Sequence, residues 1–72
     1  MKVINVIGSI YKTSDTEIYN ILKPIAVSLH IDCIFTYLKY AEQYREGCVV
    51  YDNKAYAMTN EDINKLIEYL KQ

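Results

Sequence analysis

Apolar residues either alternate with polar ones or recur at helical spacing along most of this 72-residue chain. Residues 2–7 are rich in Val and Ile and are followed by Gly8, which predicts a mostly buried strand. After a polar loop, apolar residues repeat at intervals of three or four, which predicts a helix with one apolar face. The residues of this face are Ile18, Ile21, Leu22, Ile25, Ala26 and Leu29.

The predicted helix has a clear start and a proline in its interior. Ser14 and Glu17 have the spacing of a capping box, in which the side chain of each accepts the backbone N–H of the other. Pro24 removes one intrahelical hydrogen bond and crowds the carbonyl of Asn20. Because the apolar face continues in phase beyond Pro24, we predict a kinked helix that ends at His30.

A second strand is predicted for residues 31–40, with two largely apolar faces, as in a strand that is covered on both sides. We expect residues 40–46 to form a short helical turn or loop that ends at Gly47. One face of the strand carries Ile31, Cys33, Phe35 and Tyr37, and the other carries Ile34 and Leu38.

A hairpin is predicted for residues 48–58, with Asp52 and Asn53 at its turn. Asp and Asn tolerate the positive φ angles that a two-residue hairpin turn requires. With this turn, the two strands pair Tyr51 with Lys54, Val50 with Ala55 and Val49 with Tyr56.

The two faces of the predicted hairpin differ in side-chain size. We expect a helix to pack closely on the face of small residues, so that the face with the tyrosines must meet something else. The small face carries Cys48, Val50, Ala55 and Ala57, and the larger face carries Val49, Tyr51 and Tyr56.

The chain closes with a second predicted helix, capped by Thr59 or Asn60 and apolar at Ile63, Leu66, Ile67 and Leu70. The element order calls for a parallel, right-handed crossover between the first two strands, followed by the antiparallel hairpin. We therefore predict one α/β domain over residues 1–72, with a mixed four-stranded sheet and helices mainly on one face.

Composition narrows the class of protein. The chain is 51% apolar and 24% charged, and its formal net charge of −1 argues against a dedicated nucleic-acid binder. No apolar stretch approaches the roughly 20 residues of a membrane span. The apolar run at residues 3–7 is too short for the core of a signal peptide, so we expect a cytoplasmic protein without membrane contact.

The metal-binding and thiol side chains are few. His30 is the only histidine and there is no Cys-x-x-Cys, so we expect neither a metal site nor a cofactor. Cys33 and Cys48 lie in strand-like apolar runs, which is typical of buried, reduced thiols.

Four segments carry a resemblance to the very small thioredoxin-like proteins of archaea and bacteria. They are residues 2–8 (KVINVIG), 29–32 (LHID), 49–54 (VVYDNK) and 60–66 (NEDINKL). The resemblance covers nearly the whole chain and implies a minimal thioredoxin-like fold, β-α-β-β-β-α, with its middle helix reduced.

The resemblance also implies where the redox site of that family would lie. The family places Cys-x-x-Cys after the first strand, where the helix N-terminus lowers the pKa of the first thiol. Here this loop is Tyr11-Lys12-Thr13-Ser14, so Tyr11 and Ser14 occupy the cysteine positions. The family's cis-proline corresponds to Gly47, which is followed by Cys48. We therefore expect no thiol-disulfide exchange of the usual kind.

An unusual excess of tyrosine suggests an interaction surface instead. Eight of the nine aromatic residues are Tyr, which suits interfaces because its apolar ring ends in a polar group. A reduced middle helix would uncover one sheet face, where tyrosines could bind a second copy or another protein. The same tyrosines could equally surround a small core with their hydroxyls in water. The candidate interface residues are Tyr37, Tyr40, Tyr44, Tyr51 and Tyr56.

Two other functions stay open. The loop before the first helix could bind phosphate or another anion, because a helix N-terminus presents free N–H groups, although ordinary capping explains the same residues. Cys48 could form mixed disulfides as a single thiol, or could be inert. Of the three functions, we expect a non-catalytic interaction module, as a homodimer or with a protein partner. The candidate anion-binding residues are Gly8, Ser9, Lys12, Thr13 and Ser14.

Overall fold

The structure, a computed structural model, describes residues 2–38 and 46–72. The predicted β-α-β-β-β-α order is confirmed. The elements are β1 (Val3–Gly8), α1 (Thr13–Ser28), β2 (Asp32–Tyr37), β3 (Cys48–Tyr51), β4 (Lys54–Ala57) and α2 (Asn60–Leu70).

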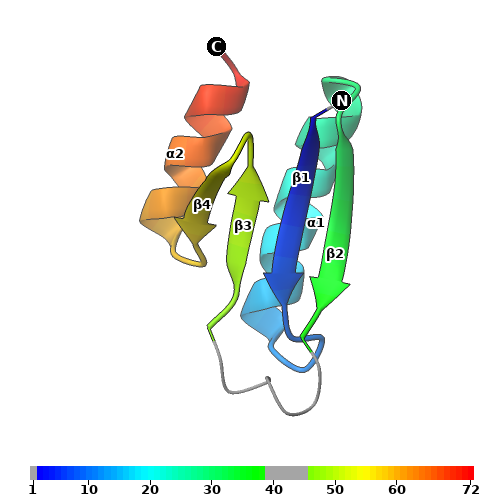
Figure 1. The fold of residues 1–72 in the computed structure, drawn as a ribbon, viewed down its shortest axis with the longest axis vertical. Coiled ribbons are helices and arrows are strands. Elements are labelled where there is room, and N and C mark those ends of the chain that lie inside the picture. Colours follow the sequence, from blue (N-terminus) through cyan, green and yellow to red (C-terminus); the bar gives the residue numbers. More distant parts are fainter. Residues whose placement is uncertain (1, 39–45) are drawn as a thin grey trace.

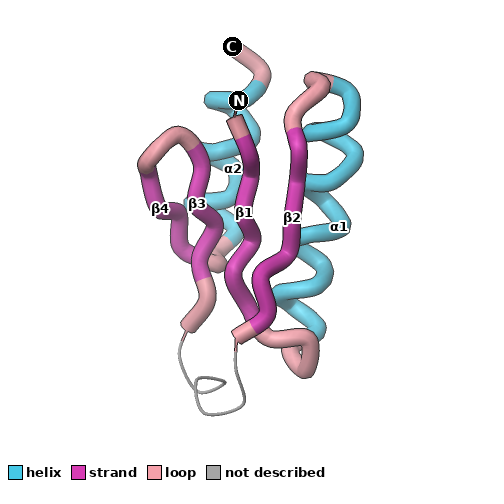
Figure 2. The backbone as a smooth tube through the Cα atoms, turned by 45° about the vertical axis from the view of Figure 1, so that its right-hand side comes forward, coloured by secondary structure: helices cyan, strands magenta, loops and turns pink. Residues whose placement is uncertain are grey.

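The strands form one mixed four-stranded sheet in the order β2-β1-β3-β4, as predicted (Figure 1). β1 pairs in parallel with β2 and antiparallel with β3, and β3 pairs antiparallel with β4. Both described helices lie on the same face of this sheet (Figure 2). The outer strands β2 and β4 are therefore the edges, and one sheet face has no described helix over it.

The hydrophobic core lies between the sheet and the two helices. Burial alternates along β1, where Ile4 and Val6 are fully buried and their neighbours are not. Leu22 of α1 and Leu66 of α2 reach the same core and are also fully buried. This period of two on the strand and near four on the helices is the pattern from which the elements were predicted.

The hairpin has the predicted register and turn. The pairs are Tyr51 with Lys54, Val50 with Ala55 and Val49 with Tyr56. Asp52 and Asn53 have φ angles of 52° and 63°, as a type I′ turn requires at both central positions.

The predicted orientation of the hairpin is wrong, because the tyrosines face the helices. Tyr51 and Tyr56 are only 5% and 4% exposed, and the Tyr51 ring meets the Tyr69 ring of α2 edge-on, with 6.0 Å between centroids. Pairing of Val6 with Val49 puts both on the buried side and takes the tyrosines with them. Large rings bury more apolar surface than Ala or Cys, which favours this orientation. The small residues therefore lie on the face opposite the described helices.

The first helix starts and ends differently from the prediction. It begins at Thr13 after Lys12, and no side chain caps it, so the predicted capping box is wrong. It continues past Pro24 and ends at Ser28 rather than at His30. His30 has a φ of 57°, and its N–H donates to the carbonyl of Val27 in a Schellman-type ending.

The second helix is capped, as predicted, by Thr59, whose hydroxyl accepts the N–H of Asp62 at 3.2 Å. The prediction that both faces of β2 are covered is wrong, because Ile34, on the face away from the described helices, is 48% exposed. Of the predicted turn at residues 40–46, only Glu46 is among the described residues. None of the helices in the described ranges is long and apolar enough to cross a membrane.

Candidate functional site

A cleft lies where β1 ends, between the start of α1 and the start of α2. Its volume is about 210 Å³. In open α/β sheets, ligands bind beyond the carboxyl ends of the parallel strands, and this cleft has that position. It is lined by Lys12, Ser14, Asp15, Glu46, Gly47, Ala57, Met58 and Thr59.

The carboxylate of Asp15 closes the loop that precedes α1. It accepts the backbone N–H of Ser9 at 2.9 Å, and both residues are buried. The Ser9 hydroxyl in turn accepts the N–H of Tyr11 at 3.2 Å. A Cβ on Gly8 would lie 2.7 Å from the Asp15 carboxylate, so a glycine at this position lets the carboxylate approach β1.

Gly47 is required by a close backbone approach. A Cβ at this position would lie 2.2 Å from the carbonyl oxygen of Ile7, and a backbone oxygen of β1 cannot move aside cheaply. No cis peptide bond occurs among residues 2–38 and 46–72. Gly47 therefore serves to bring the start of β3 against the end of β1.

The cleft gives little support to the predicted anion site. The N–H groups of Ser9 and Tyr11 already donate to protein oxygens. An anion in the cleft would face the carboxylates of Asp15 and Glu46, with Lys12 as the one cation among the described lining residues. Of the other predicted anion-binding residues, Ser14 lines the cleft, whereas Gly8 and Thr13 do not.

The residues that correspond to a redox site are only partly brought together. Lys12, Ser14 and Gly47 line the cleft, but Tyr11 is 73% exposed and does not. Cys48 is half-buried and follows the cleft residue Gly47 on β3, where it is the register partner of Ile7 and Ala57.

The two thiols lie on opposite faces of the sheet. Cys33 is buried on the helix side, as the partner of Ile4, whereas Cys48 is on the other side. Burial raises the pKa of the Cys33 thiol, and the nearby Lys23 ammonium partly offsets this. No thiol pair is therefore available for internal disulfide exchange.

The predicted tyrosine interface does not form one surface. Tyr51 and Tyr56 belong to the core, which corrects their assignment as interface residues. Tyr37 is 66% exposed at the end of β2. Tyr40 and Tyr44 lie outside the described residues.

The side of the sheet opposite the two described helices, here termed the open sheet face, is turned toward the reader in Figure 1. Thr36 donates its hydroxyl to the side-chain oxygen of Asn5 at 2.7 Å, which pairs these two polar side chains, whereas the carboxylate-bearing Asp32 of β2 is exposed. The other side chains are mostly apolar, larger on β1 and β2 and smaller on β3 and β4. The face consists of Val3, Asn5, Ile7, Asp32, Ile34, Thr36, Cys48, Val50, Ala55 and Ala57.

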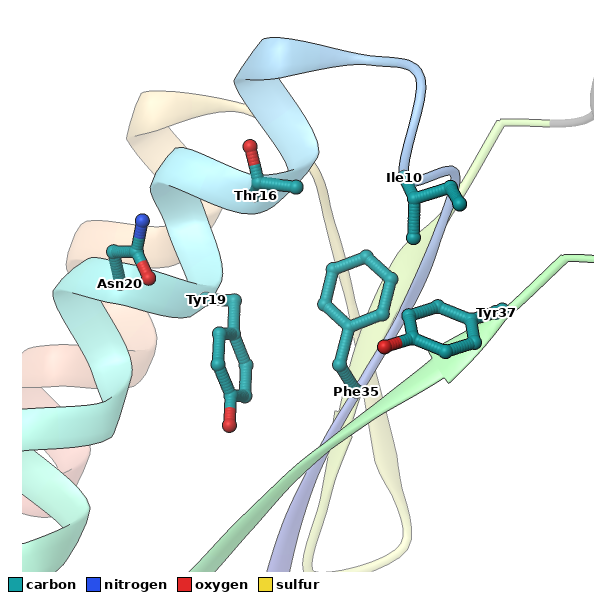
Figure 3. Close-up of a pocket in the computed structure, with 6 residues that line it drawn as sticks. All are labelled: Ile10, Thr16, Tyr19, Asn20, Phe35 and Tyr37. Carbon is teal, nitrogen blue, oxygen red and sulfur yellow. The ribbon is translucent and has the colours of Figure 1, made fainter.

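A second cavity, here termed the aromatic pocket, opens between α1 and β2 and has a volume of about 220 Å³ (Figure 3). The rings of Tyr19 and Phe35 meet edge-on with 5.6 Å between their centroids. The centroid of the Tyr37 ring lies 5.3 Å from that of Phe35. The local sequence pattern placed Phe35 and Tyr37 on one strand face but gave no role to Tyr19. The pocket is lined by Ile10, Thr16, Tyr19, Asn20, Phe35 and Tyr37.

Comparisons of the chain with protein-family models, with curated proteins and with solved structures find no match. Within residues 2–38 and 46–72, no group of three or more His, Cys, Asp or Glu side chains is placed to hold a metal ion. The open sheet face, the cleft and the aromatic pocket are thus the features from which a function is inferred.

Proposed function

We propose that this chain is a non-catalytic protein-interaction module with a minimal thioredoxin-like fold, which self-associates through the open sheet face. The observation that carries this proposal is a mostly apolar sheet face with no described helix or strand over it. The element order β-α-β-β-β-α and the strand order β2-β1-β3-β4 support the thioredoxin-like assignment.

The shape of the open sheet face favours a second copy as its partner. A two-fold axis that runs along the strands, between two stacked sheets, places β2 over β4 and β1 over β3 of the second copy. The larger side chains then meet small ones, with Ile34 over Ala55 and Ile7 over Cys48. Stacked sheets pack about 10 Å apart when their side chains interdigitate in this way.

The size of the face predicts a weak dimer. Two strands of six residues and two of four, about 4.8 Å apart, cover roughly 300 Å² in projection. Stable complexes bury about 800 Å² on each partner. We therefore expect dissociation constants between about 10 µM and about 1 mM.

The positions of the thiols support a non-catalytic role. Tyr11 and Ser14 stand where the family has its cysteines. Cys33 and Cys48 lie on opposite sheet faces, so no described residues form a dithiol centre.

Sedimentation velocity over a concentration series tests the proposal with a matched pair of variants. Ile34→Lys places a charge on the open sheet face, and Ile21→Lys places one on α1, at 48% and 51% exposed positions respectively. Between about 10 µM and 1 mM, the wild type and Ile21→Lys should shift toward dimer, whereas Ile34→Lys should stay monomeric. A monomeric wild type throughout, or equal behaviour of the two folded variants, would show that this face does not self-associate.

A further inference from the structure

We propose that the outer edge of β2 and the aromatic pocket together bind an extended segment of another protein. The segment pairs antiparallel with β2 and carries a large apolar side chain followed, two residues later, by a carboxylate. This site lies at the sheet edge and is independent of the open sheet face.

The backbone of β2 presents free hydrogen-bonding groups at this edge. Along a parallel strand, the N–H and C=O of alternate residues point to opposite sides. Leu38 donates its N–H to Gly8 of β1, so the even-numbered positions of β2 face β1. Cys33, Phe35 and Tyr37 therefore direct their backbone groups outward, where no described strand pairs with them.

One of these outward groups already has a partner. The ammonium of Lys23 donates to the carbonyl of Cys33 at 3.2 Å, from α1 across the edge of the sheet. The backbone groups of Phe35 and Tyr37 remain for an added strand, next to the aromatic pocket. Strand addition at such an edge obtains its affinity from main-chain hydrogen bonds and its specificity from pockets for alternate side chains.

The aromatic pocket accepts an uncharged apolar side chain. Its volume of about 220 Å³ is below the range of about 300–1,000 Å³ typical of drug-sized ligands, and suits a single side chain. The walls are aromatic, and its rim residues Thr16 and Asn20 are neutral. A side chain opposite Phe35 on an added strand projects to the helix side of the sheet and so into this pocket.

Charge complementarity defines the second recognition element. The added strand runs antiparallel to β2. The residue that follows its apolar side chain by two positions therefore lies opposite Cys33, and its side chain projects to the helix side of the sheet. That residue faces Lys23, whose ammonium contacts a neutral carbonyl and has no ion pair among the described residues. An Asp or Glu there would complete the pair.

A second copy would not satisfy this edge through its own β2. The side chains that β2 presents on the helix side are Cys33, Phe35 and Tyr37, and none is a carboxylate. The chemistry therefore favours a different protein with the pattern apolar-x-acidic in an extended segment.

Nuclear magnetic resonance titration with a synthetic peptide tests this proposal. The probe is the acetylated, amidated peptide Ser-Val-Thr-Phe-Thr-Glu-Thr-Ser, and a second peptide has Lys in place of Glu. The Glu peptide should shift the amide resonances of Phe35 and Tyr37 and bind wild type about threefold to fivefold more tightly than the Lys peptide. In Lys23→Glu this preference should reverse, and in the control Lys65→Glu it should persist.

Three results would overturn the edge site. The first is the absence of shifts at Phe35 and Tyr37 with millimolar peptide. The second is a Lys23→Glu variant that keeps the wild-type preference. The third is concentration-dependent broadening at Phe35 and Tyr37 without peptide in the Ile34→Lys variant, which would mean that a second copy occupies the edge even when the open sheet face is blocked. The peptide titration does not probe the open sheet face, so a negative result at the edge of β2 does not bear on the proposed self-association.

Discussion

Replacement of Tyr56 by Ala tests which face of the hairpin is buried. The Tyr56 ring is 4% exposed and packs in the core between β4 and the helices. A buried aromatic ring covers about 150–250 Å² of surface, which at about 25 cal/mol per Å² corresponds to roughly 4–6 kcal/mol. Relaxation around the cavity places the expected loss of unfolding free energy for Tyr56→Ala at about 3–5 kcal/mol.

A loss of this size is large for so small a chain. At about 0.05–0.15 kcal/mol per residue, 72 residues give a total stability of about 4–11 kcal/mol. Tyr37→Ala is the matched control, because this tyrosine is 66% exposed on the same side of the sheet and should cost under about 1 kcal/mol.

Urea denaturation followed by far-ultraviolet circular dichroism measures both variants. Tyr56→Ala should unfold at a much lower urea concentration than wild type or be unfolded without urea, whereas Tyr37→Ala should stay near wild type. A folded Tyr56→Ala variant of unchanged stability that no longer self-associates would refute the buried orientation. It would restore Tyr56 as an interface residue.

Three further variants or reagents probe other parts of the structure. His30→Gly should raise the unfolding free energy in urea by about 0.5–1 kcal/mol, since glycine adopts the positive φ of 57° without strain; a less stable variant would contradict this. Gly47→Ala should lower the urea midpoint strongly, because the new Cβ meets a backbone oxygen 2.2 Å away, and an unchanged midpoint would contradict the close approach. Cys48 should react with an aromatic disulfide reagent faster than buried Cys33. The rate constant of the Cys48 reaction should fall as the protein concentration rises. A rate independent of concentration would speak against its place in the dimer.

For the hairpin, the local sequence pattern predicts the turn and the register but not which face is buried. Asp52 and Asn53 alone predict the turn, and the turn determines the register of the two strands. A period of two produces two faces, but it does not say which one is buried when both are largely apolar. That choice depends on the pairing of Val6 with Val49, which links residues far apart in the sequence.

The start of α1 and the aromatic pocket depend on contacts of the same long-range kind. The spacing of Ser14 and Glu17 fits a capping box, yet Asp15 bonds instead to the preceding loop, and the helix begins at Thr13. The aromatic pocket requires α1 to lie over β2 so that Tyr19 meets Phe35, and neither local pattern contains that position.

The cleft was anticipated better because its residues flank predicted element ends. Lys12 and Ser14 border the start of α1, and Gly47 precedes β3. Ends of neighbouring strands and helices meet at one edge of an α/β sheet, so residues near these ends converge. The sequence does not reveal that Asp15 and Glu46 give the cleft its acidic character.

We propose that the open sheet face binds a second copy with β2 over β4. An isotope-filtered nuclear Overhauser experiment on a mixture of ¹³C-labelled and unlabelled protein at about 1 mM tests this packing. We expect intermolecular contacts between the methyl groups of Ile34 in one copy and those of Ala55 and Ala57 in the other. The absence of intermolecular contacts, or contacts confined to the helix side of the sheet, would contradict it.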